Sequence, residues 1–125
     1  MGQALAELRA EALASLSGCL RIAAQADRML VQGASDEERL AWRIAVNVNK
    51  YWTAVRNTQS AQRAIEVLGG NGTIETFSPL VQLYRDSMVL ESWEGSHNVL
   101  VQQVLRDSAR YGAHLAFQKE LGEAL

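Results

Sequence analysis

The sequence predicts an all-α protein, an up-down helical bundle with three long helices and one short helix. Apolar residues recur every three or four positions over long stretches, and with only one proline in the chain little sequence alternates as a β-strand does. The length of 125 residues predicts a single domain, residues 1–125, and a hydrophobic content of 48% allows a modest core.

The first predicted helix runs from the N-terminus to Gly33, because glycine commonly ends helices. One face of this helix carries apolar and small residues at helical spacing: Leu5, Leu8, Ala12, Leu16, Cys19, Ala23, Ala26 and Leu30. Since Cys19 falls on this apolar face, we expect it to be a small buried residue.

A capping box from Ser35 to Glu38 predicts the start of the second long helix. Its apolar face comprises Ala41, Ile44, Ala45, Val48, Trp52, Val55, Ala61, Ile65 and Leu68. A polar stretch at 56–62 interrupts this face and indicates a kink or a solvated turn. We read Trp42 and Trp52 as core or interface anchors. The glycines of "GGNG" at 69–72 end the helix.

Residues 72–94 read as irregular chain around one short helix, which Pro79 starts and which contains Leu80, Leu83 and Tyr84. The last long helix begins near Ser96. Its predicted inner face consists of Val101, Val104, Leu105, Ala109, Gly112, Leu115 and Ala116. Small residues at 109 and 112 would allow another helix to approach closely.

Charge and cysteine content exclude several classes of function. A net charge of −2 gives no basic field for a phosphate backbone, which makes nucleic acid a poor default partner. A lone Cys19 cannot form an intrachain disulfide, and no stretch of about 18 apolar residues would span a bilayer. We therefore predict a cytoplasmic protein, with an organelle matrix as the alternative location. His97 and His114 lack the spacing to other ligands that a metal site needs, so we predict no metal.

The segment "AIEVLGGNGTIETFSPLVQLYRDSMVLESWEGSHNVLVQQVLR", residues 64–106, resembles the C-terminal signature region of the FAD-dependent acyl-CoA dehydrogenases. Four elements match in order and spacing: a helix ending in LGGNG, a helix started by proline, Tyr-Arg-Asp, and an EG[ST] motif that opens the last helix. "WEGSHN" resembles the branch that contains the adaptive-response alkylation protein. The resemblance implies a flavoprotein oxidoreductase of fatty acid metabolism that desaturates an acyl-CoA thioester between its α and β carbons.

By this resemblance Glu94 is the base that removes the α-proton while a hydride leaves the β-carbon for the flavin. Burial against Trp93 and a flavin would make the carboxylate a stronger base. Gly95 would leave room for the thioester, and Arg106 matches a family arginine near the active site. The alternative reading of Glu94 is a carboxylate that stabilises a helix N-terminus, and Arg106 equally suits a solvated helix position.

Other residues match positions that contact FAD in the family. Gly69, Gly70 and Glu66 match the segment that approaches the FAD of a neighbouring subunit, although the family commonly has glutamine at the position of Glu66. Ser96 and Asn98 match positions after the base that contact the flavin nucleotide, and Ser96 also suits a helix cap.

The tyrosine of Tyr-Arg-Asp is followed by Arg85 and Asp86, which match the family's Arg-Asp pair. We expect the two side chains to form an ion pair that fixes the loop ahead of Glu94.

Family members carry an N-terminal helical domain and a β-domain ahead of this bundle, and we align the bundle's own first helix upstream of Met1. We therefore expect an uncovered apolar groove, filled by a homo-oligomer or by another chain. The sequence leaves open whether the chain alone is an enzyme. One reading is a dehydrogenase C-terminal domain that is inactive in isolation; the other is an interaction or scaffold bundle of the same descent. Nucleic-acid binding is third, supported by scattered arginines at Arg39, Arg43, Arg56 and Arg63.

Overall fold

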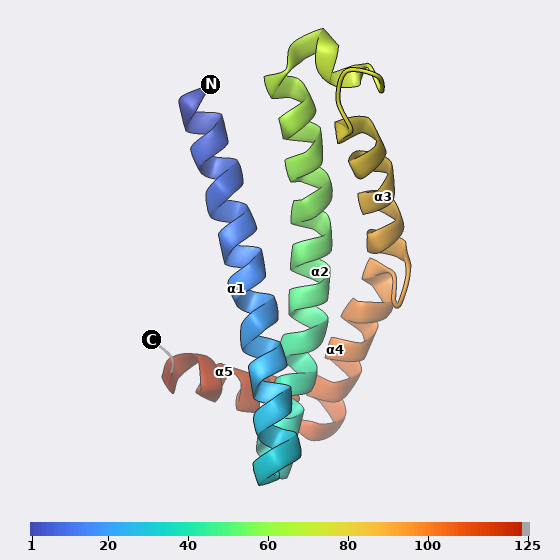
Figure 1. Cartoon of the computed structure of the whole chain (residues 1–125). Helices are drawn as coiled ribbons and strands as arrows, with labels where there is room; N and C mark the ends of the chain where they lie inside the picture. The colour runs from blue at the N-terminus through green and yellow to red at the C-terminus, as the bar shows by residue number, and fades with distance from the viewer. Residues whose placement is uncertain (124–125) are drawn as a thin grey trace.

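The computed structural model describes residues 1–123, which form helices and turns without any β-strand (Figure 1). The all-α class predicted from the sequence is confirmed. In chain order the elements are α1 (Gly2–Gln32), α2 (Asp36–Val67), the 3₁₀ helix η1 (Gly69–Thr73), α3 (Leu80–Ser92), α4 (His97–Tyr111) and α5 (Ala113–Glu123). Within this described range, no helix combines the length and the apolar character needed to cross a membrane.

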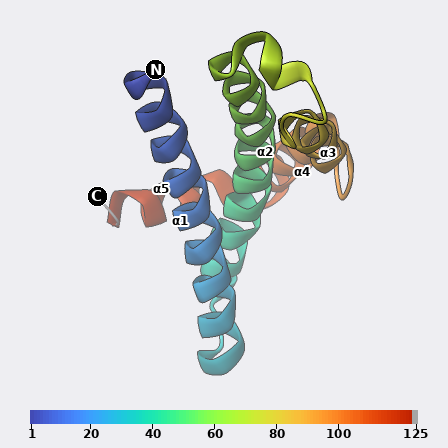
Figure 2. The same ribbon diagram turned by 45° about the horizontal axis from the view of Figure 1, so that its top comes forward.

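Helix α2 is the centre of the molecule. It packs against α1, α3, α4 and α5, while η1 sits at its C-terminal end. Figures 1 and 2 show α1 and α3 on opposite sides of α2, with α4 and α5 behind its N-terminal half. The buried hydrophobic side chains lie where these helices meet α2: Ala41, Ile44, Ala54, Leu100, Ala113 and Ala116.

The predicted capping box is confirmed at the start of α2. The Glu38 backbone N–H donates to Ser35 Oγ at 3.2 Å, and the Ser35 N–H donates to Glu38 Oε2 at 2.8 Å. The chain remains helical through the polar stretch at 56–62, so the prediction of a solvated turn there is wrong. The stretch is polar because part of it faces carboxylates of α1: Ser60 Oγ donates to Glu11 Oε2 at 2.8 Å.

The predicted end of α2 at the glycine run is confirmed, since the helix ends at Val67 and Gly69 has a φ of 60°. The last glycine of the run has a packing role. A Cβ at Gly72 would lie 2.3 Å from the Ile65 carbonyl oxygen, well inside any allowed contact. The turn therefore lies directly against α2, and position 72 admits only glycine.

Two boundaries in the C-terminal half differ from the prediction. The helix predicted to start at Pro79 is confirmed, but it extends over 13 residues to Ser92, where irregular chain was expected. The predicted last helix is divided at Gly112, which has a left-handed φ of 64° and ends α4. The predicted inner face holds only in part: Ala116 is buried, but Val101, Leu105 and Leu115 are exposed, and Leu100 is buried in their place.

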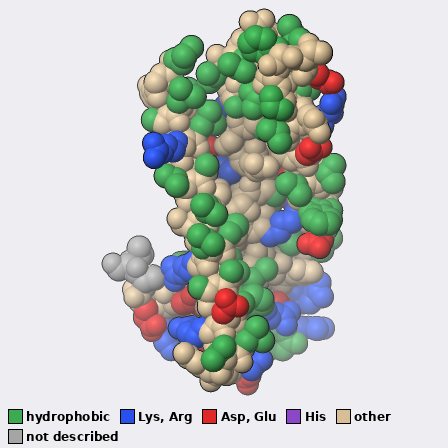
Figure 3. Space-filling view, viewed as in Figure 1, with side chains coloured by type: hydrophobic (Ala, Val, Ile, Leu, Met, Phe, Trp, Pro, Cys, Tyr) green, Lys and Arg blue, Asp and Glu red, His purple; other side chains and the backbone are tan. Residues whose placement is uncertain are grey.

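The predicted apolar face of α1 is not part of the core. Leu5, Leu16 and Leu30 are more than half exposed, and Cys19 is exposed rather than buried. Helix α1 instead packs on α2 through small and polar positions. A Cβ at Gly18 would lie 2.5 Å from Asn49 Oδ1, which shows how closely the two helices approach. Figure 3 shows hydrophobic side chains exposed along α1 and over α3 on this face of the molecule.

Candidate functional site

Glu94 lies in the short loop between α3 and α4, in an unusual backbone conformation. Its φ is 51°, and no other non-glycine residue within 1–123 has a positive φ. In the left-handed region of positive φ the Cβ lies too close to the backbone, at a cost of about 1–2 kcal/mol for any residue other than glycine. Such strain concentrates at functional sites. The Glu94 side chain is exposed, as is 54% of the neighbouring Trp93.

Gly95 follows with a φ of 109°, a conformation that side chains rarely adopt. A Cβ at this position would lie 3.0 Å from Leu100 Cδ2. Gly95 therefore allows the first turn of α4 to pack close beneath the loop. The predicted role of leaving room for a thioester stays a prediction.

Ser96 and Asn98 lie beside Glu94, at the N-cap and in the first turn of α4. The Ser96 side chain makes no capping hydrogen bond, and the first turn of α4 contains no acidic residue. Backbone N–H groups of this turn are therefore open to an anionic partner. Arg106 is exposed on the same helix, but at a rise of 1.5 Å per residue it lies roughly 14 Å along α4 from His97.

The other predicted cofactor residues are far from this loop. Gly69 and Gly70 lie in η1, and Glu66 lies in the last turn of α2, all exposed. Figure 1 shows η1 beyond one end of α3 and the loop between α3 and α4 at the other end. A helix of 13 residues is about 20 Å long, so the two groups of predicted residues lie at opposite ends of α3.

The predicted ion pair between Arg85 and Asp86 is wrong. Arg85 Nη1 lies 2.6 Å from Glu75 Oε1 in the turn before α3. Neighbouring positions on a helix point in different directions, so Arg85 and Asp86 do not face each other. Both partners of the observed pair are more than half exposed, which limits its contribution to about 0–1 kcal/mol.

An open cavity of about 520 Å³ adjoins the loop, between α1, α2 and the C-terminal end of α3. Trp93, Leu90, Leu16 and Cys19 contribute to its walls, with polar groups from α2 beneath them. Trp93 thus lines this cavity directly before Glu94 in the chain.

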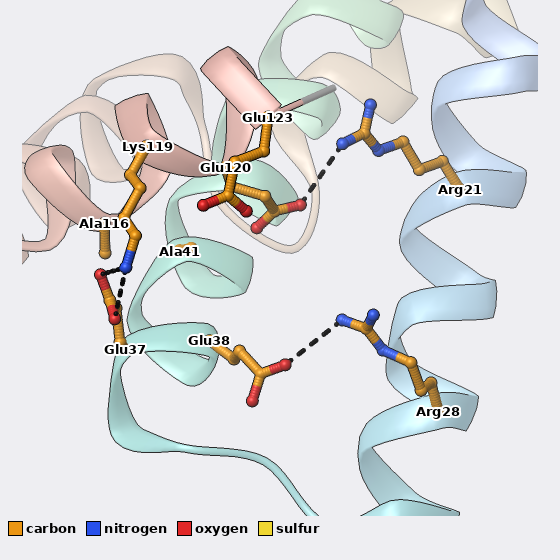
Figure 4. Close-up of a pocket in the computed structure, with 9 residues that line it drawn as sticks. All are labelled: Arg21, Arg28, Glu37, Glu38, Ala41, Ala116, Lys119, Glu120 and Glu123. Carbon is orange, nitrogen blue, oxygen red and sulfur yellow. Dashed lines mark hydrogen bonds and ion pairs between the residues drawn. The ribbon is translucent and has the colours of Figure 1, made fainter. Parts of the chain in front are cut away.

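A second cavity, of about 330 Å³, lies between α1, the start of α2 and α5, and its charged groups pair with one another (Figure 4). Lys119 Nζ contacts both Glu37 carboxylate oxygens at 3.0 and 3.1 Å. Arg28 lies 3.5 Å from Glu38, and Arg21 lies 3.5 Å from Glu120. The Lys119 and Glu120 pairs attach α5 to α2 and α1, whereas the Arg28–Glu38 pair links α1 to α2. Hydrogen bonding from Lys119 to Glu37 raises the pKa of the lysine.

Sequence reasoning missed the buried ion pair between α2 and α4. Asp107 is 3% exposed and accepts from Arg43 Nε at 3.1 Å and from Arg43 Nη2 at 2.8 Å. This pair ties α4 to α2 across 64 positions of sequence, and no local pattern marks it.

Two further arginines of the predicted nucleic-acid set are also paired. Arg56 lies near Glu11, and Arg63 contacts Glu7 and Glu11. Hydrogen bonds from Gln3 and Arg63 lower the pKa of Glu7. Within residues 1–123, no group of three or more potential ligands is placed to hold a metal ion.

Comparison with known proteins identifies the family. The family model described as "Acyl-CoA dehydrogenase, C-terminal domain" matches residues 1–109. Acyl-CoA dehydrogenase family member 11 of Caenorhabditis elegans is 34% identical over 93 residues, which cover 74% of this chain and 15% of that protein. AidB of Escherichia coli (strain K12) is 38% identical over 73 residues, covering 58% of this chain and 13% of that protein.

A solved structure agrees with this assignment. The apo-form of Bd2924 matches with a TM-score of 0.88 and 26% sequence identity, over 96% of this chain and 24% of that one. The chain therefore spans less than a quarter of the length of each of these three relatives. With the family model matching most of its residues, the chain belongs to the acyl-CoA dehydrogenase C-terminal domain family.

Proposed function

We propose that the chain is the C-terminal domain of an FAD-dependent acyl-CoA dehydrogenase, in which Glu94 removes the α-proton of an acyl-CoA thioester. The observation that carries the proposal is the φ of 51° at Glu94. Glycine would adopt this conformation without strain, yet a carboxylate occupies it at the opening of α4. A group kept at a conformational cost and projecting from a loop suits a base that must reach a substrate.

Each neighbour of Glu94 has a defined part in this proposal. The Glu94 carboxylate takes the α-proton, and its backbone N–H donates to the thioester carbonyl as negative charge develops there. Gly95 keeps the backbone close to the substrate. Trp93 limits water at the base when the site closes, since in this structure it lines the adjoining cavity.

The residues present fit a flavin nucleotide. The uncapped first turn of α4 and the free Ser96 hydroxyl can donate to phosphate or ribose oxygens. At Gly69 and Gly70 no atom lies within 4 Å of where a Cβ would be, so the backbone there is open to a ligand. FAD, when bound, accepts the hydride that leaves the β-carbon.

The separation of about 20 Å between these two groups bears on assembly. It supports a homo-oligomer in which Glu94, Ser96 and Asn98 serve one flavin while the glycine run reaches the flavin of another subunit. We also propose that the protein is cytoplasmic and that the chain is inactive without a flavin-binding β-domain.

Arg106 lies away from the loop, so we propose that it contacts a part of the substrate beyond the reacting atoms.

Domain exchange tests the assignment. The chain would replace the matching segment of a family dehydrogenase, and anaerobic bleaching of the flavin by acyl-CoA would be followed. We expect the exchanged protein to bleach and its Glu94→Gln variant to keep the flavin without bleaching. If both proteins bleach equally, the assignment of Glu94 as the base is refuted. The chain alone is expected not to bind FAD stoichiometrically, and a bleachable complex would refute the claim that it is inactive.

A second candidate is an interaction or scaffold bundle of the same descent, favoured by the exposed leucines of α1. Here the chain would bind a protein partner and would not need Glu94. Failure of the domain exchange, together with saturable binding of an amphipathic helix at the α1 face, would support it. Nucleic-acid binding ranks below both, because Arg43, Arg56 and Arg63 are paired with carboxylates; a salt-dependent mobility shift would reverse that order.

A further inference from the structure

The loop that carries Glu94 is attached to α2 at both ends, through two adjacent residues of that helix. Lys50 contacts the end of α3, and Tyr51 contacts the start of α4. Neither residue belongs to the family signature between 64 and 106, and no motif or spacing in the sequence selects them.

At the first end, Lys50 Nζ donates to the Leu90 carbonyl oxygen at 2.6 Å. Leu90 is in the last turn of α3, where carbonyl groups have no partner within the helix. A cation at this position also interacts favourably with the negative end of the helix dipole. The same turn ends with the Trp93 N–H donating to the Val89 carbonyl at 3.0 Å. Lys50 therefore holds the turn from which the loop departs.

At the second end, the Tyr51 ring packs edge-on against the His97 ring, with centroids 4.9 Å apart and planes at 69°. His97 is the first residue of α4. Its Nε2 lies 3.3 Å from Glu91 Oε2, without the geometry of a hydrogen bond, and the atom is buried with no other partner. The imidazole is thus held by Tyr51 and by packing, in contact with the last turn of α3.

We propose that Lys50 and Tyr51 are positioning residues for Glu94, a step that rests on the proposed function. Four residues, 93–96, separate α3 from α4, and both ends of this loop rest on one turn of α2. A loop this short with fixed ends has little freedom, so its central residue keeps the left-handed conformation and its carboxylate keeps one direction. Loosening either end lets Glu94 relax towards an unstrained φ and away from the substrate.

Hydrogen exchange on the full chain tests the attachment directly. Lys50→Gln should speed exchange of the Trp93 amide. Tyr51→Leu should speed exchange of the Leu100 amide, which donates to the Ser96 carbonyl oxygen at 3.0 Å. We expect about tenfold in each case, because a charged hydrogen bond or an aromatic pair contributes roughly that factor. Lys50→Arg and Tyr51→Phe should restore slow exchange. Lys119→Gln, which removes an exposed pair with Glu37, is the matched control and should change neither amide.

The catalytic consequence is read in the exchanged flavoprotein. Lys50→Gln and Tyr51→Leu should slow bleaching about tenfold at saturating acyl-CoA and leave the half-saturating concentration unchanged, with rescue by the conservative variants. Unchanged exchange at both amides would refute the attachment. Faster exchange with an undiminished bleaching rate would refute the positioning role while the proposed function stands. If Glu94→Gln bleaches normally, the proposed function fails, and exchange alone then decides whether the attachment exists.

Discussion

Replacing Glu94 by glycine is expected to stabilise the protein. The φ of 51° costs a non-glycine residue about 1–2 kcal/mol, and glycine removes that cost. Glycine also adds freedom to the unfolded chain, which opposes folding by roughly 0.5–1 kcal/mol. The Glu94 side chain is exposed, so its loss forfeits little burial. The difference is a rise of about 0.5–1 kcal/mol in the free energy of unfolding.

Urea unfolding of three proteins measures this effect: wild type, Glu94→Gly and Glu94→Ala. Alanine keeps the Cβ and therefore the strain, so Glu94→Ala should lie within about 0.5 kcal/mol of wild type. The reasoning is refuted if Glu94→Gly is no more stable than Glu94→Ala. A more stable Glu94→Gly protein that has lost bleaching in the domain exchange would indicate that the strained carboxylate serves function at the expense of stability.

Three further predictions concern other parts of the bundle. Ser35→Ala should lower the free energy of unfolding by about 1 kcal/mol through loss of the cap, measured with urea. Because the Ser35 backbone N–H lowers the pKa of Glu38, the capping contribution is full above the ordinary glutamate pKa and fades as pH falls through the lowered value. The Glu38→Gln variant should lack that pH dependence. Asp107→Asn should cost about 1–3 kcal/mol, since Arg43 then loses a charged partner that is itself buried, and a midpoint equal to wild type would contradict this. We expect the chain to self-associate through the exposed leucines of α1; Leu20→Lys should shift it towards monomer in a light-scattering concentration series, whereas wild type that is monomeric throughout would dismiss the interface.

Elements with local signals were predicted well from the sequence. The capping box at Ser35 fixes the start of α2, and the glycine run fixes its end, because each depends on residues within one turn. Tertiary packing determined the features that were missed. The apolar spacing on α1 is real, but α1 approaches α2 at Gly18 and its buried Gln25 donates to Glu120 of α5, while its leucines remain exposed. At Gly112 the spacing continues across a break that only the backbone conformation reveals.

In the candidate site too, local motifs were predicted from the sequence and contacts between distant residues were not. Motif spacing selected the stretch from Trp93 to Asn98, and the structure gathers these residues in one loop and the helix turn after it. Contacts between distant positions could not be predicted, because nothing near Lys50 in the sequence indicates that it meets Leu90 forty residues later. For Arg85 the sequence predicted the wrong partner. We expected it to pair with the next residue, but adjacent residues on a helix point in different directions, and Arg85 pairs with Glu75 instead.

The central place of α2 has a consequence for folding and motion. Since α1 and α3 pack on opposite sides of α2, the helix is shared by two half-structures, neither of which is complete without it. We expect its amides to exchange only on global unfolding, as the last cooperative unit to open. The half of α1 near its N-terminus can then open on one side of α2 while the loop that carries Glu94, on the other side, keeps its conformation.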